Sequence, residues 1–149
     1  LDEPTIGLDA VSKLAVRDFV KRLNRERGVT VILTTHDMDD IESLCSRVIV
    51  IGGGKILSNG TLAELRSRVT RERWLTVDLD GDGESISDPD ATIIRREGQR
   101  VCLAFDPQAV PTAEIIRRIT ASHPIRDLFV ENPPIESIIA RLYAQGGAA

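Results

Sequence analysis

Two kinds of apolar pattern follow one another along the first half of the chain. Over residues 10–27 the apolar positions recur at helical spacing, in a segment that Asp9 can cap and Gly28 can end. Residues 29–34 and 47–51 are rich in β-branched residues and almost wholly apolar, as in strands buried on both faces. This alternation of helix and strand predicts an α/β sheet. The apolar stripe of the helix comprises Val11, Leu14, Ala15, Phe19 and Leu23.

Shorter signals predict the elements that follow in this half. A second helix is expected to begin at Asp37 and to reach about Cys45. The three glycines of residues 52–54 predict the turn of a β-hairpin. Thr61 and Glu64 have the spacing of a capping box, so a further helix is expected to begin there.

The second half follows a different order. Apolar and polar residues alternate from Leu75 to Leu79, as in a half-buried strand, and the Asp-, Gly- and Ser-rich stretch 78–90 predicts a strand end and a loop. Gly98 lies in a predicted hairpin turn, and Pro111 suits the first turn of a helix. The expected order is β-β-β-α-β-α, with elements over residues 75–79, 92–96, 101–105, 111–122, 125–130 and from 135 onward.

The charge balance changes near residue 71 and predicts two domains. Residues 1–71 carry 11 basic and 10 acidic side chains, whereas residues 72–149 carry 8 and 13. We therefore expect part of an α/β domain over residues 1–71, followed by a small α+β domain with its own core over residues 72–149.

Composition excludes several classes of protein. The net charge of −4 and the acidic second half do not favour nucleic-acid binding, which needs a basic surface. No apolar run approaches the length of a membrane span. The two cysteines, Cys45 and Cys102, are too few for a disulfide scaffold or a zinc site, and they fit a reducing compartment.

Candidate chemistry lies at the ends of two predicted strands. Asp2 and Glu3 are adjacent carboxylates before a turn at Pro4, and His36 comes just after the apolar run 29–34. Ligands of open α/β sheets bind beyond the carboxyl ends of the strands. If the two strands are parallel neighbours, the two carboxylates and the imidazole converge on one edge of the sheet. One carboxylate can then serve a metal ion while the other orients a water.

The order of these motifs resembles the second half of an ABC-type ATP-binding domain. Residues 1–5 (LDEPT) resemble the end of a Walker B strand, residues 7–9 (GLD) a D-loop, and residues 34–37 (TTHD) the switch histidine with its neighbours. Together the three form an ordered set. Residues 46–65 resemble the tail that follows the switch histidine in transporter ATPases. The fold implied is a partial P-loop NTPase sheet followed by a small α+β domain.

The resemblance implies a role for each matching residue. Asp2 would hold Mg²⁺ through a water, and Glu3 would orient or deprotonate the water that attacks ATP. His36 would contact the γ-phosphate, and Asp9 would lie at the interface of two ATP-binding subunits and couple their sites. Glu3 and His36 are thus the candidate catalytic residues, Asp2 the metal residue and Asp9 the cofactor-binding residue.

Other motifs of the family do not occur in this sequence. A phosphate-binding loop G-x-x-x-x-G-K-[ST] is missing, and Gly52-Gly53-Gly54-Lys55 lacks its spacing. The Ser-Gly-Gly signature and the Gln-bearing loop are missing as well. The chain begins with Leu1 rather than Met, so we expect a piece of a longer protein that neither binds ATP tightly nor hydrolyses it by itself.

The second half resembles the C-terminal extension of drug- and polysaccharide-export ATPases, most clearly over residues 124–136 and at Leu142-Tyr143. The partners implied are a membrane permease and a second ATP-binding subunit in a homodimer, without nucleic acid. The location implied is the cytoplasmic face of the cell membrane.

Two alternatives remain open, and one physical consequence follows. The chain can be the distal part of a transporter ATPase, as the resemblance implies. The first alternative is a non-catalytic module for interaction or dimerisation. The second is part of a soluble ABC-type ATPase. Without further strands and helices, its apolar strand edges and faces would be open, and such surfaces pair with other chains. We therefore expect the chain to self-associate.

Overall fold

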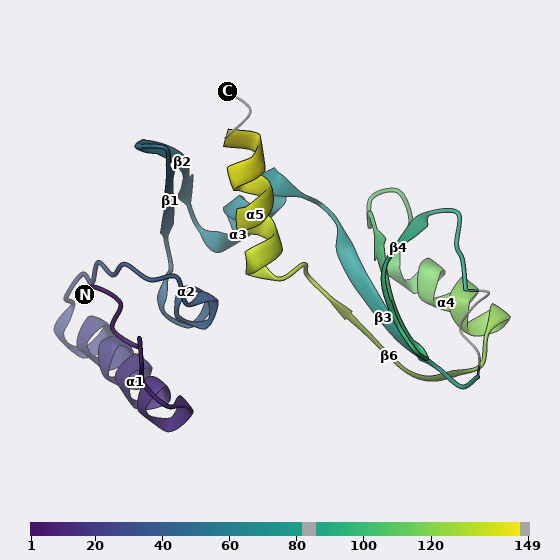
Figure 1. Ribbon diagram of the computed structural model, residues 1–149, viewed down its shortest axis with the longest axis horizontal. Coiled ribbons are helices and arrows are strands. Elements are labelled where there is room, and N and C mark those ends of the chain that lie inside the picture. Colours follow the sequence, from purple (N-terminus) through teal and green to yellow (C-terminus); the bar gives the residue numbers. More distant parts are fainter. Residues whose placement is uncertain (82–85, 147–149) are drawn as a thin grey trace. The chain divides into compact units, whose positions relative to one another are not determined.

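The structure is a computed structural model that describes residues 1–81 and 86–146, in two units (Figure 1). The first unit comprises Leu1–Arg66 together with the segment from Ile135, and the second comprises Ser67–Pro134. Residues 82–85 of the predicted loop lie outside the described residues. The chain is mixed α/β, as predicted, and its named strands pair antiparallel.

The helices of the first half begin and end at the predicted capping residues. Helix α1 spans Ala10–Arg27 with Asp9 as its N-cap, and Gly28 ends it with φ 62° in the left-handed region that glycine adopts readily. Helix α2 spans Met38–Leu44 with Asp37 as its N-cap. These two predictions are confirmed. The helix ends were predictable because the capping residues are adjacent to them in the sequence.

A β-hairpin follows, as the glycines predict. Strand β1 spans Val48–Gly52 and pairs antiparallel with β2, Lys55–Gly60. Gly53 and Gly54 form the two-residue turn with φ 57° and 72°. Two consecutive positive φ values characterise the turn that suits the twist of a hairpin, and glycine adopts them without strain.

The capping box is also present. Helix α3 spans Leu62–Val69. The backbone N–H of Thr61 donates to Oε2 of Glu64 at 2.7 Å, and the N–H of Glu64 donates to Oγ1 of Thr61 at 3.1 Å. Each side chain thus satisfies a backbone N–H that lacks a partner within the helix.

The last helix, α5 (Ile135–Gly146), groups with the first unit and not with the strands that precede it. Tyr143 on this helix donates a hydrogen bond from its hydroxyl to the carbonyl of Ile51 in β1 at 2.9 Å. From the sequence, this helix was expected to belong to the domain of residues 72–149. The functional division at residue 71 itself stays a prediction.

The predicted strand over residues 29–34 is wrong. Thr34 alone forms a bridge, which is parallel, with Asp2. The N–H of Glu3 donates to the carbonyl of Thr34 at 2.8 Å. The apolar sequence is extended here, but a strand needs a neighbour along its length, and the described residues supply only the segment around Asp2. The side chain of Ile32 is consequently 80% exposed.

The apolar stripe of α1 is likewise exposed in the described part of the chain. Val11, Leu14 and Phe19 are 77%, 59% and 56% exposed, while Val20 is buried. In β1, Ile49 and Ile51 are more than half exposed. The burial expected for residues 47–51 is therefore wrong for these two side chains. These open surfaces are of the kind that the expectation of self-association assumed.

The second unit is a four-stranded antiparallel sheet with one helix. Strands β3 (Arg73–Leu79), β4 (Ala91–Glu97), β5 (Arg100–Phe105) and β6 (Ile125–Glu131) lie in the order β4-β5-β3-β6. Helix α4, Thr112–Ser122, lies between β5 and β6 in the chain (Figure 1). The predicted order of three strands, a helix and a strand is confirmed, with boundaries within two residues of the prediction.

The core of this unit lies between the sheet and α4. Leu75 and Val77 of β3, Leu103 of β5 and Ile115 of α4 are fully buried within one cluster. Alternate residues of β3 and β5 belong to this core, which agrees with the period of two predicted for residues 75–79. The apolar spacing over residues 112–122 matches a helix with one face toward the sheet.

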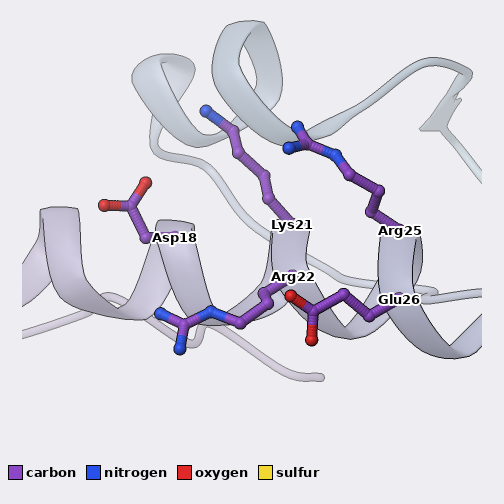
Figure 2. A pocket seen from close by; sticks show the side chains of 5 residues that line it. All are labelled: Asp18, Lys21, Arg22, Arg25 and Glu26. Carbon is purple, nitrogen blue, oxygen red and sulfur yellow. The ribbon is translucent and has the colours of Figure 1, made fainter.

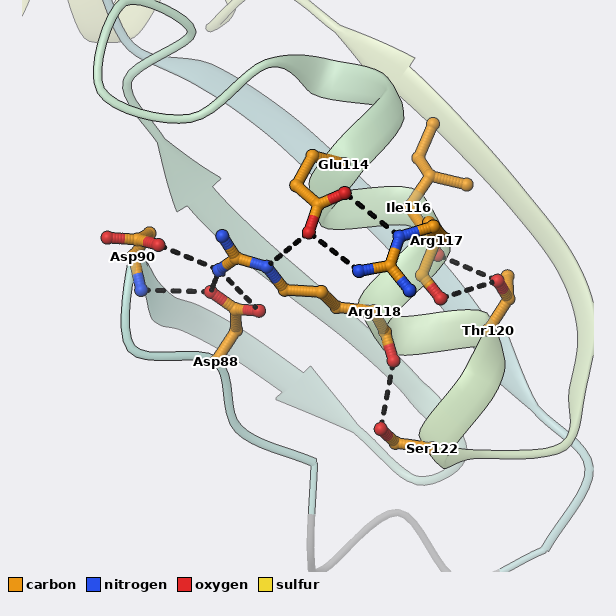
Figure 3. A network of polar contacts seen from close by, with 8 residues as sticks. All are labelled: Asp88, Asp90, Glu114, Ile116, Arg117, Arg118, Thr120 and Ser122. Carbon is orange, nitrogen blue, oxygen red and sulfur yellow. Dashed lines mark hydrogen bonds and ion pairs between the residues drawn. The ribbon is translucent and has the colours of Figure 1, made fainter.

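Ion pairs join α4 to the segment before β4 (Figure 3). The guanidinium of Arg118 lies 3.3 Å from Asp88, 2.7 Å from Asp90 and 3.1 Å from Glu114. Arg117 pairs with Glu114 as well, at 2.8 Å. Two cations therefore share one carboxylate, and Arg118 links three acidic residues from two segments.

Candidate functional site

The structure brings Glu3 and His36 together. Nδ1 of His36 donates a hydrogen bond to Oε1 of Glu3 at 2.8 Å. The parallel bridge between Asp2 and Thr34 positions the two segments side by side, so that the residues just after the bridge meet. The side chain of His36 is 76% exposed and that of Glu3 is 31% exposed. The pair is therefore open to a ligand from solution.

The carboxylate changes the acid–base behaviour of the imidazole. The hydrogen bond to Glu3, and then its negative charge, raise the pKa of His36 above its ordinary value. His36 is thus protonated at a higher pH than a free histidine. A cationic imidazole beside a carboxylate can bind an anionic group and retain a proton at Nε2.

Glu3 itself has an uncommon backbone conformation. Its φ of 44° is the positive value of a non-glycine residue, which side chains rarely adopt. Such a conformation persists where the surrounding contacts determine it, and it is frequent at functional sites. Its N–H donates to Thr34, and its carbonyl accepts from the N–H of Ile6 at 3.2 Å. The backbone on both sides of Glu3 is thereby held.

Asp2 lies next to this pair and is bonded to Thr34, whose hydroxyl donates to its Oδ1. Within residues 1–81 and 86–146, no group of three or more His, Cys, Asp or Glu side chains is arranged to hold a metal ion. Mg²⁺ is bound by oxygen ligands, commonly by one or two carboxylates with waters and substrate phosphates. The exposed carboxylate of Asp2 with the neighbouring hydroxyl of Thr34 fits that kind of donor set.

Asp9 is the N-cap of α1 and is hydrogen-bonded within the first turn of that helix. Its Oδ1 accepts the N–H of Ser12 at 2.8 Å, and its Oδ2 accepts the hydroxyl of the same residue at 3.1 Å. These bonds lower the pKa of Asp9. Its position in the structure is thus explained by helix capping. A role between subunits remains a prediction.

Sequence reasoning missed a set of polar residues behind the Glu3–His36 pair. Asp40 accepts hydrogen bonds from Thr5 and Arg17, and Asp37 pairs with Lys13 at 2.5 Å. Lys13 holds the pKa of Asp37 below its usual range. The four-residue spacing of Lys13 and Arg17 on α1 is the one signal that could have suggested a shared partner. The bonds themselves join segments far apart in sequence.

A depression on α1 is made of charged side chains from this one helix (Figure 2). Lys21 and Arg25 extend to the same side of the helix, and acidic residues lie among the basic ones. Alternating charges of this kind are typical of a solvated helix face. The lining residues are Asp18, Lys21, Arg22, Arg25 and Glu26.

Several curated proteins are similar to part of this chain. The chain is 38% identical over 85 residues to the linearmycin resistance ATP-binding protein LnrL of Bacillus subtilis (strain 168), which is 57% of the chain. It is 45% identical over 76 residues, 51% of the chain, to the energy-coupling factor transporter ATP-binding protein EcfA2 of Lactiplantibacillus plantarum. Over about half of its length the chain is therefore similar to ATP-binding proteins of ABC transporters. No protein-family model matches it.

A methionine import ATP-binding protein, MetN of Vibrio vulnificus, is also similar, with 38% identity over 64 residues, or 43% of the chain. The aligned stretches cover only 27%, 25% and 19% of the lengths of LnrL, EcfA2 and MetN. The three names include both resistance and import, so these similarities do not fix a direction of transport.

Within the part of the chain that the structure describes, every helix is too short or too polar to cross a membrane.

Proposed function

We propose that this chain is the distal part of an ATP-binding subunit, and that the intact subunit hydrolyses ATP to drive export across a membrane. The observation that carries this proposal is the hydrogen bond between Glu3 and His36, at the end of a parallel bridge. A carboxylate and an imidazole that lie together just after two bridged segments suit the binding of a phosphate and a water.

Each residue of the pair has a part in the proposed reaction. Glu3 orients the attacking water and accepts its proton, as a general base within hydrogen-bond reach. His36, with Nδ1 bonded to Glu3, retains Nε2 for the γ-phosphate. Little covalent chemistry is required of the protein in phosphoryl transfer, so the placement of these two groups supplies the catalysis.

ATP and Mg²⁺ are the cofactors in this proposal. The carboxylate of Asp2 would hold Mg²⁺ through a water. When bound, the ion neutralises negative charge on the phosphate oxygens. Asp2 is held for this task by the hydroxyl of Thr34, which fixes one oxygen of the carboxylate. Asp9, the last of the D-loop-like residues 7–9, would couple two such sites across a dimer of ATP-binding subunits.

The chain of 149 residues alone is proposed to be inactive. A phosphate-binding loop supplies most of the grip on the nucleotide through its backbone N–H groups and its lysine. This sequence contains no G-x-x-x-x-G-K-[ST] segment. The proposed partners are accordingly the remainder of the subunit, a second subunit and a membrane permease, at the cytoplasmic face of the cell membrane.

Export is favoured over import by the second half of the chain. Residues 72–149 resemble the extension of export ATPases, and the longest of the three alignments is with a protein named for linearmycin resistance. The transported substrate is left open by these observations.

Measuring ATP turnover by the complete protein that carries this sequence tests the proposal. Glu3→Gln is expected to lower kcat roughly 10²- to 10⁴-fold, since it removes a general base. Glu26→Gln, on the exposed surface of α1, is the matched control and should retain wild-type turnover. Undiminished turnover of Glu3→Gln would refute the assigned role. Glu3-dependent turnover by the 149-residue chain alone would refute its proposed inactivity.

A further inference from the structure

The carboxylate of Asp40 is fully buried and receives hydrogen bonds from three different segments. Thr5 donates its hydroxyl to Oδ2 at 2.5 Å, Arg17 donates Nε–H to Oδ1 at 2.7 Å, and Thr35 donates its hydroxyl to Oδ2 at 3.4 Å. We propose that Asp40 is a positioning residue that sets the geometry of the Glu3–His36 pair. This inference rests on the proposed function.

Two of these partners adjoin the pair in sequence. Thr5 is two residues after Glu3, and Thr35 immediately precedes His36. One carboxylate therefore ties both segments that carry the candidate catalytic side chains. Asp40 itself is in the first turn of α2, a helix that starts directly after the histidine segment. A shift of Asp40 would move both sides of the 2.8 Å contact between His36 and Glu3.

The hydrogen bond from Thr5 to Asp40 helps to hold the strained backbone of Glu3. A residue with φ of 44° returns to a relaxed conformation unless its neighbours hold it. The N–H of Glu3 is held by Thr34 on the side of the bridge. On the other side, the turn that follows Glu3 is held by the bond from Thr5 to Asp40. Without this bond, the carboxylate of Glu3 is free to leave the imidazole.

The charge of Asp40 is matched to its surroundings. A buried carboxylate is tolerated where it is paired and hydrogen-bonded. The side chain of Arg17, 11% exposed, provides the counter-charge, and the bond to Asp40 raises the pKa of Arg17. Both carboxylate oxygens are used, Oδ1 for Arg17 and Oδ2 for the two hydroxyls. An asparagine has one acceptor oxygen and therefore cannot replace all of these bonds.

The first test compares variants in the complete protein. Asp40→Asn and Thr5→Val are expected to lower kcat roughly 10- to 100-fold, the effect of misplacing groups by about 1 Å, with KM for ATP nearly unchanged. Thr5→Ser keeps the hydroxyl and should restore kcat. Asp39→Asn removes the same charge from the neighbouring exposed position and is the matched control. The double variant of Asp40→Asn and Thr5→Val should have the same kcat as Asp40→Asn alone, because both substitutions remove the same bond between Thr5 and Asp40.

A second measurement does not depend on ATP turnover. The titration of His36, followed by NMR in the 149-residue chain, should move toward that of a free histidine in Thr5→Val, and return in Thr5→Ser. If the wild-type complete protein hydrolyses no ATP, the proposed function fails, while this titration still tests Asp40. Wild-type kcat together with an unchanged His36 titration in a folded Thr5→Val variant would overturn the inference. A kcat that falls only in proportion to the unfolded fraction would overturn it too.

Discussion

His36 donates a hydrogen bond to Glu3 although 33 positions separate them in the chain. The bond to the carboxylate, and its charge, raise the pKa of His36 from its ordinary value of 6.5. Replacing Glu3 with Gln removes the charge but keeps an acceptor of the same shape. We therefore expect the pKa of His36 to fall toward 6.5 in Glu3→Gln, as measured by NMR titration of the ring.

Because the pKa of His36 is raised on folding, the Glu3–His36 pair also stabilises the folded state. This stabilisation is fully present below pH 6.5 and is lost as the pH rises through the folded-state pKa of His36. A pKa of His36 that is equal in both proteins would contradict the pairing.

The hydrogen bonds of Asp9 at the start of α1 should stabilise that helix. Asp9→Ala removes the acceptor of the Ser12 N–H and should lower the melting temperature of the chain and its helix content. Asp9→Ser keeps a capping oxygen without a negative charge, so its melting temperature should remain near that of the wild type. Circular dichroism during heating measures both. Equal melting temperatures for the alanine and serine variants would show that the cap contributes nothing.

Local signals explain which parts of the fold were predictable from the sequence. Asp9 and Gly28 lie next to the ends of α1, and the glycines at 53 and 54 form the turn itself. In each case the residue and the structure that it determines are adjacent in the chain. The apolar stretch 29–34 could not be assigned in this way, because a strand exists only where a second segment pairs along it.

The candidate site divides in the same manner. The meeting of Glu3 and His36 was predictable from their positions after two extended segments. The bonds that Asp40 accepts from Thr5 and Arg17 were not, since they span 35 and 23 positions, and the spacing of Lys13 and Arg17 on α1 does not say which segment they meet. The contact of Tyr143 with Ile51, 92 positions apart, is of this kind as well. Periodicity reports which side of an element is apolar, and not which segment it meets.

Glu114 should make the second unit sensitive to acid. Its hydrogen bonds with Arg117 and Arg118 lower its pKa from 4.5 to about 2. A carboxylate whose pKa is lowered on folding stabilises the folded state above pH 4.5, and this contribution is lost as the pH falls toward 2. Fluorescence of the single tryptophan, Trp74 in β3, reports the thermal unfolding of this unit.

We expect the melting temperature to fall more steeply between pH 4.5 and pH 2 in the wild type than in Glu114→Gln. Glu97→Gln, at an exposed position of β4 in the same unit, should follow the wild type. Parallel curves for the wild type and Glu114→Gln would mean that the ion pairs do not persist in solution.

The packing of α4 against the sheet should provide much of the stability of the second unit. Ile115 is fully buried, and Ile115→Ala is expected to lower the free energy of unfolding by about 2–5 kcal/mol through lost transfer energy and a cavity. Ile94→Ala, at a side chain that is 41% exposed on β4, should cost about 1 kcal/mol or less. Urea unfolding followed by Trp74 fluorescence measures both, and similar costs would argue against this core.

The exposed apolar stripe of α1 should drive self-association of the 149-residue chain. Val11 and Leu14 are 77% and 59% exposed and lie one helical turn apart, so together they present an apolar surface to other molecules. Leu14→Lys is expected to shift the chain toward the monomer in sedimentation velocity over a concentration series. Lysine is a good helix former, so α1 itself should persist. Asp18→Lys places the same side chain at an exposed polar position and should leave association unchanged. A wild-type chain that stays monomeric at all concentrations would contradict the prediction, because the apolar surface would then remain exposed to solvent.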